Sequence, residues 1–295
     1  MQRGNIGAHC SADRIDHRAG RYARAALLLV CALTTLSGCG TSFVYNRLDF
    51  ISRYYVSSQV SLDDSQSRAL EANVDDFFAW HRRSELPRYA VFLDRVANDA
   101  VRPVSLAQLE ASQRQVEGFM TDSVDRVAPA AARWLDGLRP AQVDELFANL
   151  AEKDRKARSE RCAAPADERR AKSARRFIDE VEDWTGDLSR SQRALIASRY
   201  AALGRDECAE VAAREKSHGE FHALVNRYRT RPEFAARIAD FLGQRRGDEA
   251  ESERFLRLLA DINHSLTPEQ RQRTVTRLRV YAREMRGLAA DSEPS

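Results

Sequence analysis

The segment from Trp80 to Tyr89 holds the densest group of side chains that could do chemistry. His81 and Glu85 are four residues apart, which places them on one face of a helix, where an imidazole and a carboxylate can act as an acid–base pair. Two nearby arginines could join them to clamp an anion. The alternative is that the aromatic rings pack in the core while the charges pair along the helix. The possible ligand cluster comprises Trp80, His81, Arg82, Glu85, Arg88 and Tyr89.

Two histidines, His218 and His222, have the same four-residue spacing, which suits a metal-binding pair. The segment reads His-Gly-Glu-Phe-His, whereas zinc proteases place the glutamate directly after the first histidine. Cys162 and Cys208 could complete a four-ligand site, but the closely spaced ligand pairs of zinc modules are absent. The chain also has no glycine-rich phosphate loop and no nucleophile elbow. We therefore predict no catalytic residue, no metal site and no cofactor.

The first 38 residues have the three parts of a secretory signal peptide: a basic stretch, an uncharged apolar run and a small-residue cleavage site. The run, Ala25 to Leu36, has 12 residues, whereas a membrane-spanning helix needs about 20. Its end, Leu36-Ser37-Gly38-Cys39, resembles the lipobox of bacterial lipoproteins. That resemblance implies cleavage before Cys39 and acylation of this cysteine at its thiol and amino group by chains such as palmitate.

The residue after the cysteine is Gly40. In lipoproteins an aspartate there retains the protein at the inner membrane, so the resemblance implies the outer membrane, with the chain on its periplasmic face. The alternative is an uncleaved membrane anchor, because residues 25–46 carry no charge. The polar side chains in the second half of that segment disfavour this alternative.

Processing at Cys39 would leave 257 residues, enough for one large domain or two small ones. The full chain has 47 basic and 44 acidic residues; the leader holds five arginines and two aspartates, so the mature chain carries 42 of each. A neutral chain lacks the basic excess that nucleic-acid binding requires, so we expect no nucleic-acid partner.

Cys162 and Cys208 are the two cysteines that remain after the anchor. The bacterial periplasm is oxidising, so they form a possible disulfide. The alternative is two separate thiols, one in a loop and one on a helix, because the sequence does not show how close they lie.

The mature chain is predicted to be helical throughout, because it is rich in good helix formers and has no alternating run bounded by turn residues. Five segments share a helix-start pattern in which a cap residue precedes a glutamine by three positions. Arg139 offers no accepting oxygen and makes the weakest of these caps. The starts, at 62, 104, 138, 188 and 266, have no fixed period, which favours convergent capping over an array of helical pairs. The caps are Asp63, Ser105, Arg139, Ser189 and Thr267.

We expect an all-α domain over residues 43–288, built as a helical bundle or as stacked helical hairpins. A signal peptide at 1–38 and a tether at 39–42 precede it, and a flexible tail at 289–295 follows. Helix breaks are expected at Pro87 and between Val127 and Ala130. The aromatic segment from Phe43 to Tyr55 either lies in the membrane interface or packs on the domain.

A series of short motifs follows the lipobox: Tyr-Asn-Arg-Leu-Asp at 45–49, Tyr-Tyr-Val at 54–56, Ala-Trp-His-Arg-Arg at 79–83 and Glu-Leu-Pro-Arg-Tyr at 85–89. Together they resemble an uncharacterised family of helical lipoproteins from bacteria with two membranes, over residues 36–95. The resemblance implies the location and the helical fold but no catalytic residue. We expect a lipid-anchored, non-enzymatic interaction or structural protein of the cell envelope, with the membrane and an envelope protein as partners. The alternative is a periplasmic small-ligand or lipid binder with a cleft near Trp80–Tyr89.

Overall fold

The computed structural model describes residues 40–243 and 249–291, and within these ranges the chain forms helices and turns with no strand. The predicted all-α fold class is therefore confirmed. The predicted signal peptide at 1–38, the lipidation site Cys39 and most of the predicted tail lie outside the described residues. No helix within those two ranges combines the length and the apolar character that crossing a membrane requires.

The helices follow one another with short connections. Their bounds are α2 (Gly40–Tyr45), α3 (Leu48–Ser57), α4 (Asp64–Trp80), the π-helix η3 (His81–Glu85), α5 (Leu86–Asp99), α6 (Leu106–Asp136), α7 (Pro140–Arg161), α8 (Ala166–Thr185), α9 (Arg190–Ala201), α10 (Glu207–Tyr228), α11 (Phe234–Gly243), α12 (Glu249–Ser265) and α13 (Pro268–Ala290).

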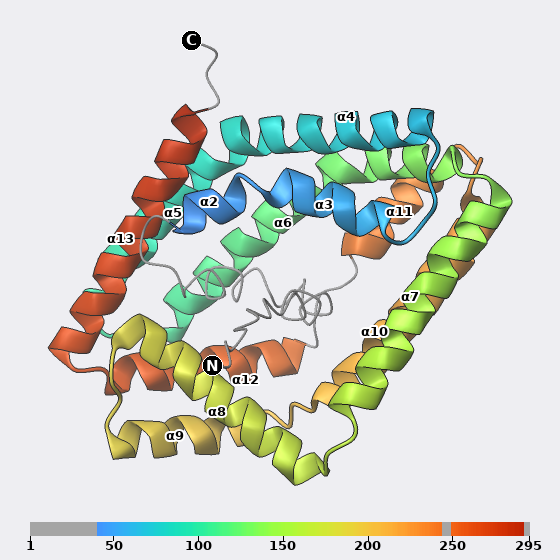
Figure 1. The fold of residues 1–295 in the computed structure, drawn as a ribbon. Helices are drawn as coiled ribbons and strands as arrows, with labels where there is room; N and C mark the ends of the chain where they lie inside the picture. The colour runs from blue at the N-terminus through green and yellow to red at the C-terminus, as the bar shows by residue number, and fades with distance from the viewer. Residues whose placement is uncertain (1–39, 244–248, 292–295) are drawn as a thin grey trace, which may run out of the picture.

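The helices are arranged as a four-sided frame (Figure 1). In that view α4 forms the upper side, α7 with α10 the right side, α8, α9 and α12 the lower side, and α5 with α13 the left side. The helix pairs α5–α13, α7–α10 and α8–α9 are in contact along the sides. Helix α6 crosses the frame diagonally from the lower left to the upper right, and α2 and α3 cross in front of it.

Three separate groups of buried side chains hold the sides together. On the left side, Ala90 and Ala97 of α5 face Ala282 of α13, all without exposed surface, and such small residues let the two helices approach closely. On the right side, α7, α10 and α11 share a second group that includes Phe147 and Val225. Helices α8, α9 and α12 share the third. The frame therefore has a core along each of three sides, as expected when helices bury one apolar stripe each.

Four of the five predicted caps act as expected. The side chains of Asp63, Ser105, Ser189 and Thr267 each accept the backbone N–H of the glutamine three residues later, and that glutamine accepts the N–H of the cap. Arg139 cannot accept, and its guanidinium instead pairs with Asp63 at 2.8 Å, while its own N–H still bonds to Gln142. Local sequence therefore sets where these helices begin.

Four of the cap glutamines also bind one another across helices. The side-chain amides of Gln66 and Gln142 exchange two hydrogen bonds, at 2.9 and 2.7 Å. Those of Gln192 and Gln270 do the same, at 2.7 and 3.2 Å. We call these the 66–142 pair and the 192–270 pair. They join the N-termini of α4 and α7 at the upper right corner of Figure 1 and those of α9 and α13 at the lower left corner.

Each glutamine makes the same further bond. Its second amide N–H donates to a backbone carbonyl that lies two residues before the cap of the partner helix, at 2.6 to 2.9 Å. For Gln66, Gln142, Gln192 and Gln270 in turn, the acceptors are Gly137, Ser61, Ser265 and Asp187. Both donors and both acceptor positions of every one of these amides are therefore used. The fifth glutamine, Gln108, bonds only within its own cap.

Two predicted helix breaks are wrong. The chain remains helical through Pro87, because the turn before it widens into the π-helix, where the N–H of Leu86 bonds to the carbonyl of His81, five residues back. A wider turn relieves the clash between a proline ring and the carbonyl four residues earlier. Pro129 lies within the unbroken helix α6 and is exposed, so water can reach the carbonyl that loses its donor.

We predict that Gln270→Ala lowers the free energy of unfolding by about 2–3 kcal/mol, because the carbonyl of Asp187 loses its bond to Gln270 and the buried Gln192 amide loses one of its two donor contacts and one of its two acceptor contacts. Gln108→Ala removes the same type of cap without a cross-helix bond and should cost less than about 1 kcal/mol. Urea unfolding of both variants measures the difference. Equal costs would show that the amide pair adds nothing beyond capping.

Candidate functional site

The predicted cluster at Trp80–Tyr89 forms the upper left corner, where α4 continues through the π-helix into α5 (Figure 1). The imidazole of His81 lies 2.7 Å from the hydroxyl of Tyr45, and the two rings stack at 5.8 Å. Phe77 and Tyr89 enclose the imidazole on other sides. Burial, with a smaller contribution from the charge of Arg82, lowers the pKa of His81 to about 4. The imidazole is therefore neutral at neutral pH.

Glu85 is held by a different partner. Its carboxylate is almost fully buried and accepts both bonds, at 2.7 and 3.0 Å, from the guanidinium of Arg88. That guanidinium also reaches Asp122 of α6 at 2.6 Å. The structure thus assigns His81 to Tyr45 and Glu85 to Arg88, and it does not bring His81 and Glu85 together as an acid–base pair. Loss of Arg88 would leave a buried carboxylate without its charged partner at the junction of α4 and α5, which is costly.

The remaining members of the cluster contact aromatic rings. Trp80 packs on Phe77 with ring centroids 5.6 Å apart, and Arg82 lies over the ring of Tyr45 at 4.9 Å. Tyr89 packs on Phe119 of α6 at 4.7 Å, and burial raises its pKa to about 12. The cluster residues therefore contact one another and fasten α2 and α6 to this corner.

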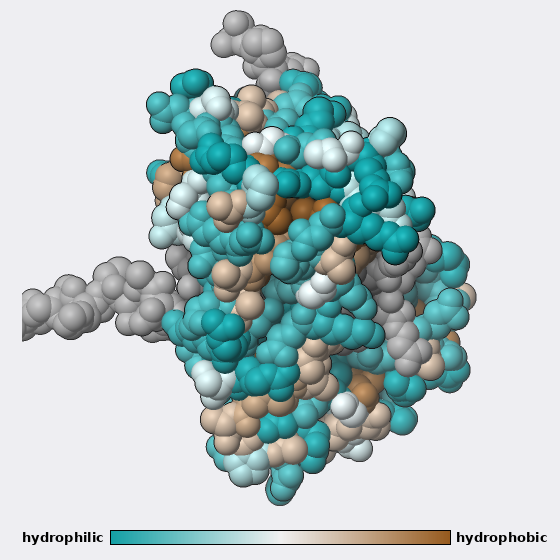
Figure 2. All heavy atoms as spheres, turned by 90° about the vertical axis from the view of Figure 1, so that its right-hand side faces the viewer, coloured by the Kyte–Doolittle hydropathy of each residue, from teal (hydrophilic) through white to brown (hydrophobic). Residues whose placement is uncertain are grey.

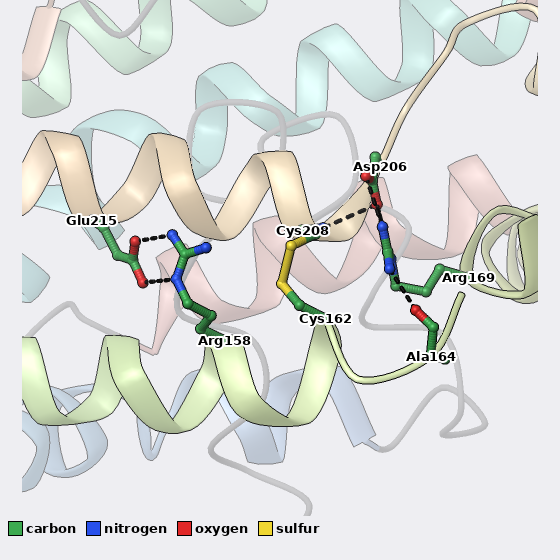
Figure 3. Close-up of a disulfide and its surroundings, with 7 residues drawn as sticks. All are labelled: Arg158, Cys162, Ala164, Arg169, Asp206, Cys208 and Glu215. Atoms are coloured by element: carbon green, nitrogen blue, oxygen red, sulfur yellow. Dashed lines mark hydrogen bonds and ion pairs between the residues drawn. A yellow bond between two sulfur atoms is a disulfide. The ribbon is translucent and has the colours of Figure 1, made fainter. Parts of the chain in front are cut away.

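Cys162 and Cys208 lie at the lower right corner and are joined by a disulfide, with their Cα atoms 5.1 Å apart (Figure 3). Cys162 is the last-turn cap of α7 and Cys208 lies in the first turn of α10. Further along the same two helices, Arg158, one turn before Cys162 in α7, forms a two-bonded ion pair with Glu215, two turns after Cys208 in α10 (Figure 3). The disulfide therefore joins the C-terminal end of α7 to the N-terminal end of α10, and packing and the ion pair hold the same two helices together.

Asp206 organises the connection next to the disulfide (Figure 3). It caps α10 by accepting the N–H of Cys208 at 3.1 Å, and Arg169 of α8 binds both its oxygens at 2.9 Å. Arg169 also donates to the carbonyl of Ala164. Burial opposes ionisation of Asp206, but the backbone N–H and the guanidinium outweigh it, so its pKa lies below the usual range. A charged cap thus fastens α8, α10 and the loop between α7 and α8.

The two histidines with metal-pair spacing have separate surroundings. His218 lies 2.7 Å from Asp154 of α7, which also accepts from Arg214 at 2.7 Å. His222 stacks on Phe147 with centroids 4.2 Å apart. Residues 40–243 and 249–291 contain no group of three metal-ligating side chains. The pattern did not reveal buried Asp154, because its partners lie 60 or more residues away in the sequence.

A second feature that sequence reasoning missed is the buried Arg271 at the start of α13. Its guanidinium donates to the carbonyl of Arg102 at 3.0 Å and to both oxygens of Asn263, at 2.9 and 2.7 Å. Burial lowers its pKa. It borders a shallow pocket of about 440 Å³, together with Pro103 and His264. Arg271 lies four residues before Val275 and seven before Leu278, on the apolar stripe of α13, and this spacing is the signal that could have identified it.

A family model described as a family of unknown function, DUF6279, matches residues 58–250, which is more than half of the chain. The chain belongs to this family. The match agrees with the predicted resemblance to an uncharacterised family, while the lipobox and the motifs at 45–49 and 54–56 precede the matched range. No curated protein and no solved structure matches the chain.

We predict that reduction of the disulfide lowers the free energy of unfolding by about 4 kcal/mol in the chain-entropy model, because the bond spans 46 residues. Urea unfolding with and without a reductant measures the change. The variant Cys162→Ser with Cys208→Ser is the control, since a reductant should leave its stability unaltered. An unchanged native chain in reductant would contradict the prediction.

We predict that acid destabilises the protein through His81. The folded-state pKa is about 4 and the unfolded-state value about 6.5, so the unfolded chain binds more protons between these values. Stability from the neutral imidazole is complete above pH 6.5 and declines as the pH falls towards 4. Between pH 7 and 4.5 the native chain should lose about 2 kcal/mol more than His81→Phe, which cannot titrate. Parallel losses in both proteins would rule out this role of the imidazole.

Proposed function

We propose that this member of DUF6279 is a lipid-anchored protein on the periplasmic face of the outer membrane, with a non-enzymatic interaction or structural role. Its three mature-chain cysteines carry this proposal. Cys39 stands at the lipobox position, and Cys162 and Cys208 are joined in the structure. Acylation of the first and oxidation of the other two are both reactions of the bacterial envelope, and a stable disulfide fits an oxidising compartment.

The non-enzymatic role is supported by how the reactive side chains are used. His81, Glu85 and Arg88 each bind a structural partner, and the rings around them pack against one another. The same packing argues against the alternative of a small-ligand or lipid binder at Trp80–Tyr89, since a ligand there would have to displace these contacts. A frame fastened at its corners suits a protein whose work is to hold a shape and present a surface.

The outer membrane is favoured over the inner membrane by Gly40, the residue after the anchor cysteine. An aspartate at this position is the signal that retains lipoproteins at the inner membrane, and its absence leaves transport to the outer membrane open. Three acyl chains would anchor the chain stably, because two membrane signals already suffice.

The experiment that tests the anchor compares the native chain with Cys39→Ser in the bacterial envelope. We expect the native protein to show the mass of a cleaved chain with three acyl chains and to fractionate with outer membranes. Cys39→Ser should keep its leader and lack the acyl chains. An uncleaved, unmodified native chain would overturn the proposal.

The interaction role is tested by mild crosslinking in intact cells, followed by purification of the acylated protein. We expect a reproducible adduct with an envelope component in near-stoichiometric amount. Recovery of the bait alone would count against an interaction role and leave a structural one.

A further inference from the structure

The outward face of α2 and α3 exposes several large apolar side chains side by side. Phe43, Phe50 and Tyr54 have 63%, 59% and 67% of their surface exposed, and Ile51 has 40%. The rings of Phe50 and Tyr54 stack at 6.4 Å, and Arg47 lies over the ring of Phe43 at 5.4 Å. Along α3 and its N-cap, the spacing of three or four residues puts Arg47, Phe50, Ile51 and Tyr54 on one face, and the contact of Arg47 with Phe43 continues it to α2. We call these five residues the aromatic face.

Helix α3 buries none of its residues, although six of its ten residues are apolar. Polar contacts fix its inner side: Arg53 pairs with Asp49 of α3 at 3.1 Å and with Glu71 of α4 at 2.5 Å. The following loop is held by Gln59 and Val60, which are buried. At the other end Tyr45 is buried against His81. The aromatic face therefore has a fixed position on the frame while its apolar surface stays open.

The charges on this side of α3 are arranged so that no carboxylate accompanies the rings. Asp49 is paired with Arg53 on the inner side, whereas the exposed Arg47 lies among the rings. Aromatic rings and arginines together are the side chains that favour the boundary between phospholipid headgroups and acyl chains. The side of the frame formed by α7 and α10 is, in contrast, predominantly hydrophilic (Figure 2).

The anchor cysteine limits how far this face can be from a membrane. Gly40, the first residue of α2, follows Cys39 directly, and Phe43 is four residues from it. Four residues span at most about 14 Å even when fully extended. An acylated Cys39 sits at the lipid surface, so the chain length holds Phe43 within about 14 Å of that surface.

We propose that the aromatic face lies in the headgroup region of the membrane that the acylated cysteine enters, so that the frame is held at the lipid surface in one orientation. This inference rests on the proposed lipid anchor. The occupant is a phospholipid surface containing anionic lipid; a second copy of the chain or another protein would be a different result in the experiment below.

The test uses the acylated full-length protein in vesicles of phosphatidylethanolamine and phosphatidylglycerol, part of which carry brominated acyl chains. Ser57→Cys places the only free thiol at the end of the aromatic face, because the other mature cysteines are acylated or bridged. An environment-sensitive fluorophore on it should be quenched by brominated lipid at least about threefold more than the same label at Arg257→Cys. Arg257 is exposed on α12, on the lower side of the frame.

The rings are tested in the labelled Ser57→Cys chain. Phe50→Gln with Tyr54→Gln should remove at least about half of the quenching, since these rings supply the buried area. The matched control is Val91→Gln with Val101→Gln, which replaces two residues of similar exposure elsewhere, 65% and 52%, and should leave quenching unchanged. Thermal unfolding and intact mass establish that each variant is folded and acylated.

Three outcomes would overturn the inference. An acylated, folded chain whose label at Ser57 is as poorly quenched as that at Arg257 would show that the face stays in water. Quenching that survives loss of both rings would assign the contact to other residues. A change in the fluorescence of the label that depends on protein concentration, and not on brominated lipid, would identify a second copy of the chain as the occupant. A chain without acyl groups would instead refute the anchor itself, which the mass measurement reveals separately.

Discussion

The reciprocal amide bonds of the 66–142 and 192–270 pairs are the interaction on which the arrangement of helices depends. Each pair joins two helix starts that are 76 or 78 residues apart in the sequence. A glutamine amide buried without partners would be costly, but here both donors and both acceptor positions are used. Helix α6 runs between the two corners that the pairs close (Figure 1), and Gln66 of the first pair also bonds to the carbonyl of Gly137, which caps the end of α6.

The sequence predicted the helix starts well, because a cap depends on residues within three positions of one another. Thr267 and Gln270, for example, set the start of α13 without reference to the rest of the chain. The two prolines were misjudged for the opposite reason. Whether Pro87 ends a helix depends on whether the preceding turn can widen, and that is decided by packing at His81–Glu85 rather than by the proline itself.

Cross-helix pairing was beyond prediction, because the same glutamine satisfies its own cap whether or not it has a partner. One signal was present: the residue before the cap is leucine in the four paired starts and Val104 in the unpaired one. The unequal gaps concealed it, because the Ser105 start falls between the members of the first pair. The Trp80–Tyr89 cluster shows the same limit. Its members were identified, but their partners Tyr45 and Asp122 lie more than 30 residues away.

The neutrality of the corner amides sets them apart from the many arginine–carboxylate contacts that cover the frame. Most of those contacts are at least partly exposed, and dissolved ions screen them. A glutamine amide carries no net charge and gains or loses no proton over the range in which proteins fold. Acidity and ionic strength therefore leave the two amide-paired corners unaltered, whereas the corners held by His81 and by arginine–carboxylate contacts respond to them. That property suits the proposed periplasmic location, where pH and ionic strength follow the outside medium.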